Sequence, residues 1–319
     1  MKKETSLVKH ESADIAAPRE LARELLENFL GRRSPATRKA YAADLRDFSE
    51  HTGGAAEGTL EAILHLVGSG RGGAHSLMLK YKRGLLERGK SPRTINRRIS
   101  TLRSAVKMAR LMGLVEWTLE VEGEKVAAYR DTRGPGRAGF LRLLAGLGDR
   151  KKDVRDRALL RLLYDLGLRR GEAASLDLED VDLERGVVAI LGKGRTEKEE
   201  LTLPPHTSAA LAAWIKARGG DPGPLFPHID RGGRCGGRIT GGGVWEIVRR
   251  LGERAGLRVR PHGLRHAGIT EALDLTGGNI RAVQRFSRHR DLRTLLYYDD
   301  NREDLGGKVS RMVSEAAGE

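Results

Sequence analysis

The sequence predicts a mainly α-helical protein of two domains, in which the second domain carries one small β-hairpin. Apolar residues recur at helical spacing through most of the first 112 residues. A charged segment with poor periodicity, residues 113–136, then interrupts this pattern and ends in Gly and Pro residues. Beyond it, the β-branched run 187–191 and the alternating segment 200–203 flank a glycine-containing turn, which is typical of a hairpin. A chain of 319 residues has room for two domains of ordinary size.

The first domain is predicted as a compact bundle of five helices over residues 18–112, preceded by a flexible N-terminal arm over residues 1–17. Two helices begin with the same signal, Ser34-Pro35 and Ser91-Pro92, in which a capping hydroxyl precedes a Pro at the first helical position. The predicted helices cover 18–30, the stretch from Ser34-Pro35 to just before Gly53, 59–67, 74–87, and a stretch from Ser91-Pro92 with Ile95, Ile99, Leu102, Val106 and Met108 as its buried stripe.

Residues 113–136 are predicted as a linker and residues 137–301 as the second domain, of mixed α and β structure. The glycine-rich segment 221–243 is expected to be a loop. A tail over residues 302–319 carries a last helix, 305–316, whose apolar stripe consists of Leu305, Val309, Met312 and Val313. The other helices predicted in this part of the chain cover 140–147, 154–166, 173–176, 206–218 and 244–255, with one more beginning near His262.

The charge of the chain predicts a polyanionic partner. The net charge is +15 and the isoelectric point is near 10.2. Aromatic residues make up only 4% of the chain, so a duplex held by its backbone fits better than a single strand stacked on rings. From Met78 to Arg110 there are eleven Lys or Arg residues and one acid, although a solvated helix face is the alternative. The candidates for DNA contact are Lys80, Lys82, Arg83, Arg93, Arg97, Arg98 and Arg103.

Other features of the sequence exclude several classes of protein. The single Cys235 rules out an internal disulfide framework and a zinc ribbon. The first residues lack the apolar core of a signal peptide, and no run approaches 18 apolar residues. We therefore expect a cytoplasmic protein, associated with the nucleoid, that has no membrane partner.

Residue types suited to phosphoryl transfer recur in the second domain. A guanidinium can hold a phosphate at two points, a phenol can act as a nucleophile, and imidazoles can move protons. On a helix that begins near residue 262, His262 and Arg265 would lie on one face about one turn apart. Taken singly, each candidate could equally be a helix cap, a surface ion pair or a core side chain. The candidates are Arg169 with Glu172, Lys193, His262, Arg265, His289 and Tyr298.

Two other interpretations of these residues find little support. His262 and His266 are spaced like metal ligands on a helix, but no Glu lies between them and no Cys is near. Gly192-Lys193 does not fit a phosphate-binding loop, because five residues separate Gly186 from Gly192 and Gly194 stands where Ser or Thr is needed. We expect neither a metal nor a nucleotide cofactor.

In their order and spacing, the candidates resemble the tyrosine recombinase family, which includes the phage integrases and the Xer-type site-specific recombinases. That family carries an Arg in a Gly-Leu-Arg turn, a hairpin Lys, a His-x-x-Arg box, a His or Trp, and a Tyr nucleophile. The resemblance covers residues 137 to about 301, and the first domain is similar to the family's core-binding domain by pattern only. The matching residues are Gly167-Leu168-Arg169, Lys193, His262-Gly263-Leu264-Arg265, His289 and Tyr298.

The resemblance implies a site-specific recombinase whose helical core-binding domain and mixed α/β catalytic domain encircle double-stranded DNA. Arg169 and Arg265 would clamp the scissile phosphate, Tyr298 would attack it to give a 3′-phosphotyrosine, and Lys193 would protonate the leaving 5′-oxygen. The two histidines would assist, His262 in proton transfer at the tyrosine and His289 by a hydrogen bond to the phosphate. The resemblance further implies a homotetramer on two duplexes that needs no metal ion and no ATP.

The sequence departs from the family pattern at two points. The family usually reads Leu-Gly-His where this chain has Ser287-Arg288-His289, and the added cation suggests a further phosphate contact. Tyr297 precedes Tyr298, so the nucleophile is ambiguous by one position, and the nine-residue step from His289 favours Tyr298. Two alternatives stay open: a type IB topoisomerase, and a DNA-binding relative that has lost catalysis.

Overall fold

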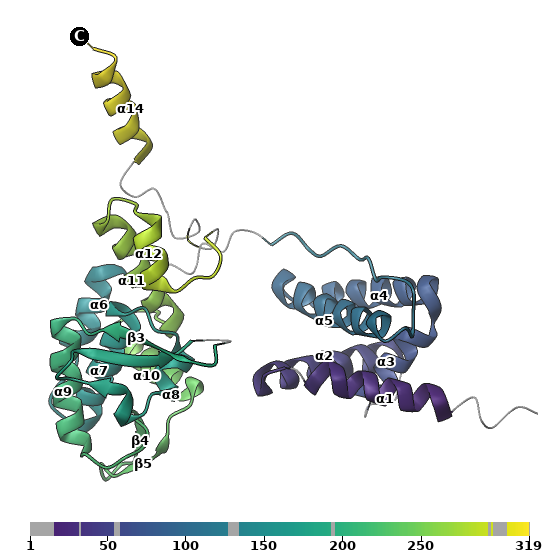
Figure 1. Ribbon diagram of the computed structural model, residues 1–319, viewed down its shortest axis with the longest axis horizontal. Coiled ribbons are helices and arrows are strands. Elements are labelled where there is room, and N and C mark those ends of the chain that lie inside the picture. The colour runs from purple at the N-terminus through teal and green to yellow at the C-terminus, as the bar shows by residue number, and fades with distance from the viewer. Residues whose placement is uncertain are drawn as a thin grey trace, which may run out of the picture. The chain divides into compact units, whose positions relative to one another are not determined.

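The computed structural model of the chain describes residues 16–31, 33–53, 58–126, 134–192, 195–292, 295 and 305–318. The chain divides into two compact units, Met1–Tyr129 and Arg130–Glu319 (Figure 1). Helices dominate the described residues, which also form two small antiparallel sheets in the second unit. The predicted fold class, mainly α with a small β-hairpin, is confirmed.

Five helices form the first unit, and proline-containing caps start two of them as predicted. The Ser34 and Ser91 hydroxyls each accept a hydrogen bond from a backbone N–H three residues on, at 3.4 Å, and each lies 2.9 Å from the hydroxyl of the Thr at that position. Gly53, with φ of 87°, ends the second helix in the left-handed conformation. The helices are α1 (Ala16–Gly31), α2 (Pro35–Thr52), α3 (Thr59–Gly68), α4 (Gly70–Glu87) and α5 (Pro92–Leu111).

The structure extends two predictions for this unit. Helix α4 begins at Gly70, four residues before the predicted start at Ala74, although Gly has a poor helix propensity. Part of the predicted linker 113–136 packs on the first unit, where Leu119 and Val121 are buried in its core. Other large members of this core are Leu25, Phe29, Leu45, Phe48, Leu66, Met78, Tyr81 and Leu102.

The second unit has helices around a three-stranded sheet. Its helices are α6 (Gly136–Ala145), α7 (Lys151–Asp165), α8 (Arg170–Ser175), α9 (Pro205–Arg218), α10 (Gly241–Arg254), α11 (Pro261–Leu275), α12 (Ile280–Ser287) and α14 (Leu305–Ala316), with a 3₁₀ turn at Leu178–Asp180. Figure 1 shows α11 and α12 at one end of this unit and a small two-stranded sheet at the other.

The predicted hairpin is present as β2 (Val187–Leu191) and β3 (Lys198–Thr202), paired so that Ala189 lies opposite Glu200. A two-residue strand, β1 (Val181–Asp182), adds to β2 and was not predicted. The loop predicted over 221–243 is wrong in part, because β4 (Pro227–Ile229) pairs there with β5 (Cys235–Arg238). Strand β5 contains two glycines, which have no side chain to favour a strand, and it forms through backbone pairing with β4.

The core of the second unit holds α11 tightly against α7. Gly268 of α11 allows this contact, since a Cβ there would lie 2.3 Å from the carbonyl oxygen of Tyr164. A small cluster of Ile269, Leu273, Val283 and Leu295 then fixes α12 against α11. The main core around β2 and α9 includes Leu159, Leu163, Val188, Ile190, Leu211, Trp214, Phe226, Val248 and Leu264. This packing brings the ends of α7, α11 and α12 together.

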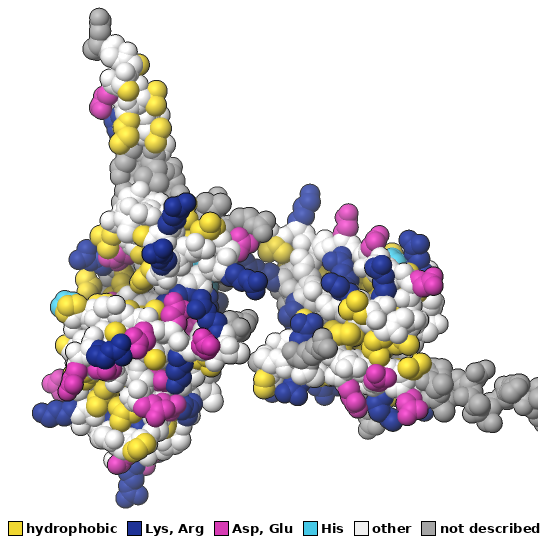
Figure 2. Space-filling view, in the orientation of Figure 1, with side chains coloured by type: hydrophobic (Ala, Val, Ile, Leu, Met, Phe, Trp, Pro, Cys, Tyr) yellow, Lys and Arg dark blue, Asp and Glu magenta, His cyan; other side chains and the backbone are white. Residues whose placement is uncertain are grey.

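Helix α14 leaves its apolar stripe uncovered. Figure 2 shows hydrophobic side chains along this helix, where Val309, Met312 and Val313 are 58%, 64% and 63% exposed. Buried apolar surface stabilises a helix, so an exposed stripe of this kind is typical of a surface that another chain covers. Among the described segments, no helix is long and apolar enough to cross a membrane.

Candidate active site

Arg169 follows the turn that ends α7 and begins α8. Gly167, with φ of 55°, reverses the chain there, as the predicted helix break required. The Arg169 backbone N–H and its Nη1 both donate to the Glu172 carboxylate, at 2.8 Å and 2.6 Å. Glu172 is 5% exposed, so this pair is no ordinary surface ion pair. The carboxylate fixes the Arg169 guanidinium, which keeps one third of its side-chain surface exposed.

Helix α11 places Arg265 directly behind this turn. Its side chain is 1% exposed, and its two Nη atoms donate to the carbonyl oxygens of Gly167 and Ser287. The Nη2 atom also lies 3.4 Å from Nε2 of His289, which follows the end of α12. One guanidinium therefore links the turn that carries Arg169 to the turn that carries His289. His262 lies one turn before Arg265 on the same helix and is exposed.

The Arg288 side chain points into the protein. The sequence suggested a phosphate contact, but the Arg288 guanidinium is directed at acceptors within the protein, and 6% of its side chain is exposed. A left-handed backbone, with φ of 55°, turns the guanidinium inward. There it donates to the carbonyl oxygens of Leu166 and Phe286 at 3.0 Å and Gly167 at 3.1 Å, and approaches Glu172 at 3.4 Å.

The electrostatics of the cluster keep its imidazoles neutral and its carboxylate charged. Desolvation, followed by the charges of Arg265 and Arg169, lowers the pKa of His289 from its ordinary 6.5 to about 4. The same causes lower the pKa of His262. Burial would raise the pKa of Glu172, but hydrogen bonds from Arg169 and the charge of Arg288 outweigh it and lower that pKa. At pH 7 both imidazoles are therefore neutral.

A cavity of about 750 Å³ opens beside this cluster. Five of its lining residues are arginines and only one is acidic, so the cavity suits a bound phosphate. Gly192 and Arg195 of the β2–β3 connection lie at its edge, on either side of the segment that contains Lys193. Arg195, Arg285 and Arg290 were not among the residues predicted for the site, because charge was their only signal in the sequence. The lining residues are Arg169, Gly192, Arg195, Glu199, Gln284, Arg285, Arg288, His289 and Arg290.

The structure thus brings together Arg169, Glu172, Arg265 and His289, with His262 on the next turn of α11. Lys193, Tyr297 and Tyr298 lie outside the described residues. His266, considered as a metal ligand, is buried, and its Nδ1 lies 3.3 Å from the Thr270 hydroxyl. The part of the chain that the structure describes contains no group of three or more His, Cys, Asp or Glu residues able to hold a metal ion.

The basic candidates of the first unit fall into two groups. Lys80, Arg83 and Arg93 have exposed side chains, and Arg103 is half-buried. Lys82 instead pairs with Glu124 at 2.8 Å and donates to the carbonyl oxygen of Glu122, so it holds the packed segment before the second unit.

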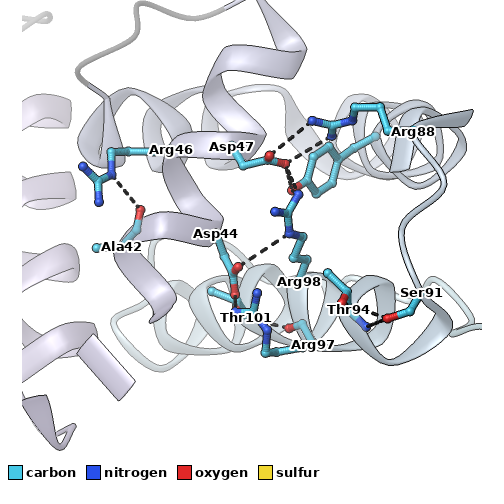
Figure 3. A network of polar contacts seen from close by, with 11 residues as sticks. Ala42, Asp44, Arg46, Asp47, Arg88, Ser91, Thr94, Arg97, Arg98 and Thr101 are labelled. Atoms are coloured by element: carbon cyan, nitrogen blue, oxygen red, sulfur yellow. Dashed lines mark hydrogen bonds and ion pairs between the residues drawn. The ribbon is translucent and has the colours of Figure 1, made fainter. Parts of the chain in front are cut away.

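Arg97 and Arg98 belong to an ionic network between α2 and α5 (Figure 3). Arg97 pairs with Asp44 at 2.5 Å, and Arg98 pairs with Asp47. Tyr81 and Arg88 also donate to Asp47, at 2.6 Å and 3.2 Å. Burial would raise the pKa of Asp47, but these donors lower it. The network assigns Arg98, with a side chain 15% exposed, a structural role between the helices.

The chain is similar in sequence and in fold to known proteins. A model of the phage integrase family matches residues 140–304. The tyrosine recombinase slr0733 of Synechocystis sp. is 36% identical over 92% of this chain and 96% of its own, and the tyrosine recombinase XerC of Xanthomonas campestris is 33% identical over 66% and 65%. A solved structure of the Tn1549 transposon integrase, in complex with a circular intermediate DNA, has the same fold, with a TM-score of 0.63 over 92% of this chain and 99% of that one, at 17% identity.

Proposed function

The chain belongs to the phage integrase family, the tyrosine recombinases, and from this premise we propose that it cuts and rejoins duplex DNA at a specific site through a phosphotyrosine on Tyr298. The observation that carries the proposal is the meeting of Arg169, Arg265 and His289 beside a cavity lined by five arginines. The comparisons give no support to the topoisomerase alternative.

In the cleavage step, Arg169 and Arg265 hold the non-bridging oxygens of the scissile phosphate and stabilise the charge that develops there. The Tyr298 oxygen attacks phosphorus and its proton passes to His262, which is neutral at pH 7 because its pKa is lowered. The bond from phosphorus to the 5′-oxygen breaks, and Lys193 gives that oxygen a proton. His289 donates a hydrogen bond to the phosphate.

The rejoining step reverses these transfers. The 5′-hydroxyl of another strand attacks phosphorus and displaces Tyr298, so the bond energy is retained without ATP. Strand exchange then requires two duplexes and four protomers, which makes a homotetramer on DNA the working assembly. Because its substrate is duplex DNA, we expect the protein to act at the nucleoid.

A nicked suicide substrate tests the proposal, because loss of a short fragment traps the covalent protein–DNA adduct on a denaturing gel. We expect the adduct to form without added metal or ATP. Binding without any adduct would identify the chain as an inactive relative. Resolution of a synthetic Holliday junction would further separate a recombinase from an enzyme that only relaxes DNA.

We also propose that the two units divide the work. Residues 18–112, with the packed segment that follows them, would bind DNA, residues 137–301 would carry catalysis, and residues 302–319 would contact a neighbouring protomer.

The exposed cations of the first unit predict a strong salt dependence of binding. If about 6–10 phosphates are contacted, affinity should fall about 10³–10⁵-fold between low and moderately high salt. Replacing Lys80, Arg83 and Arg93 together by Gln should reduce the slope of log affinity against log salt by about 3, since each contact contributes about 0.9. Lys82→Gln is the matched control, because Lys82 pairs with Glu124. An unchanged slope in the triple variant would contradict a role for these residues at the backbone.

The uncovered stripe of α14 predicts a role in assembly. Deleting residues 304–319 should spare DNA binding but reduce formation of the synaptic complex on the order of 10²-fold, because a docked helix raises the effective concentration of protomers. Native gels with two labelled duplexes measure this. Polar substitution of Val309, Met312 and Val313 should act like the deletion, whereas Ser310→Ala with Glu315→Ala should not. Normal synapsis by the truncated protein would count against the docking role.

A further inference from the structure

We propose that Arg288 is a positioning residue that holds the turns carrying Arg169 and His289 in one fixed geometry, so that the scissile phosphate meets a preformed site. The inference rests on the proposed function and concerns a residue that the tyrosine recombinase pattern does not contain. That pattern usually has Gly at this position.

The backbone of Arg288 shows that its side chain has a specific task. Arg288 ends α12 in the left-handed region, with φ of 55° and ψ of 37°. It is the only residue other than Gly with positive φ in the part of the chain that the structure describes. An L-residue with a Cβ is disfavoured in this conformation, whereas Gly adopts it freely. The interactions of the side chain must therefore compensate for a conformation that Gly would supply without strain.

The contacts of Arg288 join two pieces of backbone that are far apart in the sequence, the turn after α7 and the end of α12. Its Nη1 donates to Leu166 at the end of α7 and to Phe286 within α12, both at 3.0 Å. Its Nη2 donates to the Gly167 carbonyl at 3.1 Å, within the turn that precedes Arg169. A planar guanidinium with its donors in a fixed fork fixes both distance and angle between these turns.

Arg288 also shares its acceptors with both catalytic arginines. The Gly167 carbonyl accepts from Arg265 as well as from Arg288. The Glu172 carboxylate accepts from Arg169 at 2.6 Å and lies 3.4 Å from Arg288. Movement of Arg288 would thus disturb both members of the phosphate clamp at once. Both Nη atoms of Arg288 are directed at backbone carbonyls, so we assign it a role through these neighbours.

The charge of Arg288 supports the same role. Desolvation is the largest cause of the lowered pKa of His289, and Arg265, Arg169, His262 and Arg288 add smaller contributions in the same direction. Glu172 is the carboxylate that balances the buried cation. Loss of the guanidinium should therefore move the pKa of His289 upward, toward its ordinary 6.5.

The test compares Arg288→Gly, Arg288→Ala and Arg288→Lys in single-turnover cleavage of a nicked suicide substrate. Arg288→Gly relieves the backbone strain, so it should fold at least as well as Arg288→Ala. For a positioning residue, both variants should cleave about 10²-fold more slowly, a loss typical of misplaced reacting groups, while DNA affinity changes less than about twofold. The pKa of His289, followed by NMR titration, should rise in both variants. Arg288→Lys, which keeps the charge, should raise that pKa least.

Arg218→Ala is the matched control. The Arg218 guanidinium likewise caps backbone carbonyls at the end of a helix, at Pro224, Gly219 and Asp221, outside the cavity. Its loss should leave the cleavage rate and the pKa of His289 unchanged.

Three outcomes would overturn the inference. Wild-type cleavage by Arg288→Gly would show that Arg288 only ends a helix. Parallel loss of DNA affinity and cleavage would show a direct phosphate contact instead. If the wild-type protein formed no adduct at all, the proposed function would fail, and this inference would fail with it. If the wild type were active and Arg288→Gly equally active, only the inference would be overturned.

Discussion

Replacing Tyr298 by Phe is expected to abolish the covalent adduct while DNA binding stays intact, and replacing Tyr297 by Phe is expected to leave the protein active. The two phenols are chemically alike, so geometry must choose between them. Leu295 is buried with Ile269, Leu273 and Val283. In the helix that the sequence predicts over residues 292–299, Tyr298 would lie about 60° from Leu295, and Tyr297 about 160° from it.

Peptide mapping of the DNA-linked tyrosine decides the question. The adduct should be recovered on Tyr298, in agreement with its nine-residue step from His289. Recovery on Tyr297 would shift the register by one and would remove the reason for placing His289 at the phosphate. The helical pattern of residues 292–299 also predicts Leu292 on the buried side with Leu295, and this is wrong, because Leu292 is 46% exposed.

Arg265→Lys is expected to lower the cleavage rate by about 10²–10³-fold, the range for loss of one preorganised donor to the reacting group. Lys keeps the charge but cannot donate to the Gly167 and Ser287 carbonyls with one planar group. We therefore expect the free energy of unfolding to fall as well, by about 1–3 kcal/mol, because a buried carbonyl loses its donor.

Arg238→Lys is the control for that experiment. Arg238 also donates to two backbone carbonyls, those of Ala174 and Leu176, and pairs with Asp177, but it does not line the cavity. Chemical denaturation and single-turnover cleavage of both variants separate stability from catalysis. Equal loss of cleavage in the two variants would mean that Arg265 contributes only to folding.

Local signals explain how much of the fold could be predicted. The Ser-Pro caps, the helix break at Gly167 and the alternation of β3 each depend on neighbouring residues, and the structure has each where it was expected. Strands β4 and β5 escaped prediction because their pairing is between segments whose side chains favour no strand.

The partners of charged side chains could not be predicted, because they come from distant parts of the chain. Lys82 and Arg98 look like their exposed neighbours in the sequence, and only the fold places Glu124 and Asp47 beside them. The contacts of Arg288 could not be predicted either. Its charge suggested a phosphate contact. An Arg does not predict the left-handed turn that directs this side chain inward, because Gly is the residue that usually adopts that conformation.

The burial of Arg265, Glu172 and Arg288 has a consequence for how the protein would respond to its ionic surroundings. Mobile counterions screen exposed charges within about 10 Å at ~0.1 M ionic strength, but they reach buried ones much less. A rise in ionic strength would thus reduce the time the protein spends on DNA and leave the field at the reacting phosphate nearly constant. Salt would change how often the protein is bound without changing how fast it cleaves once bound.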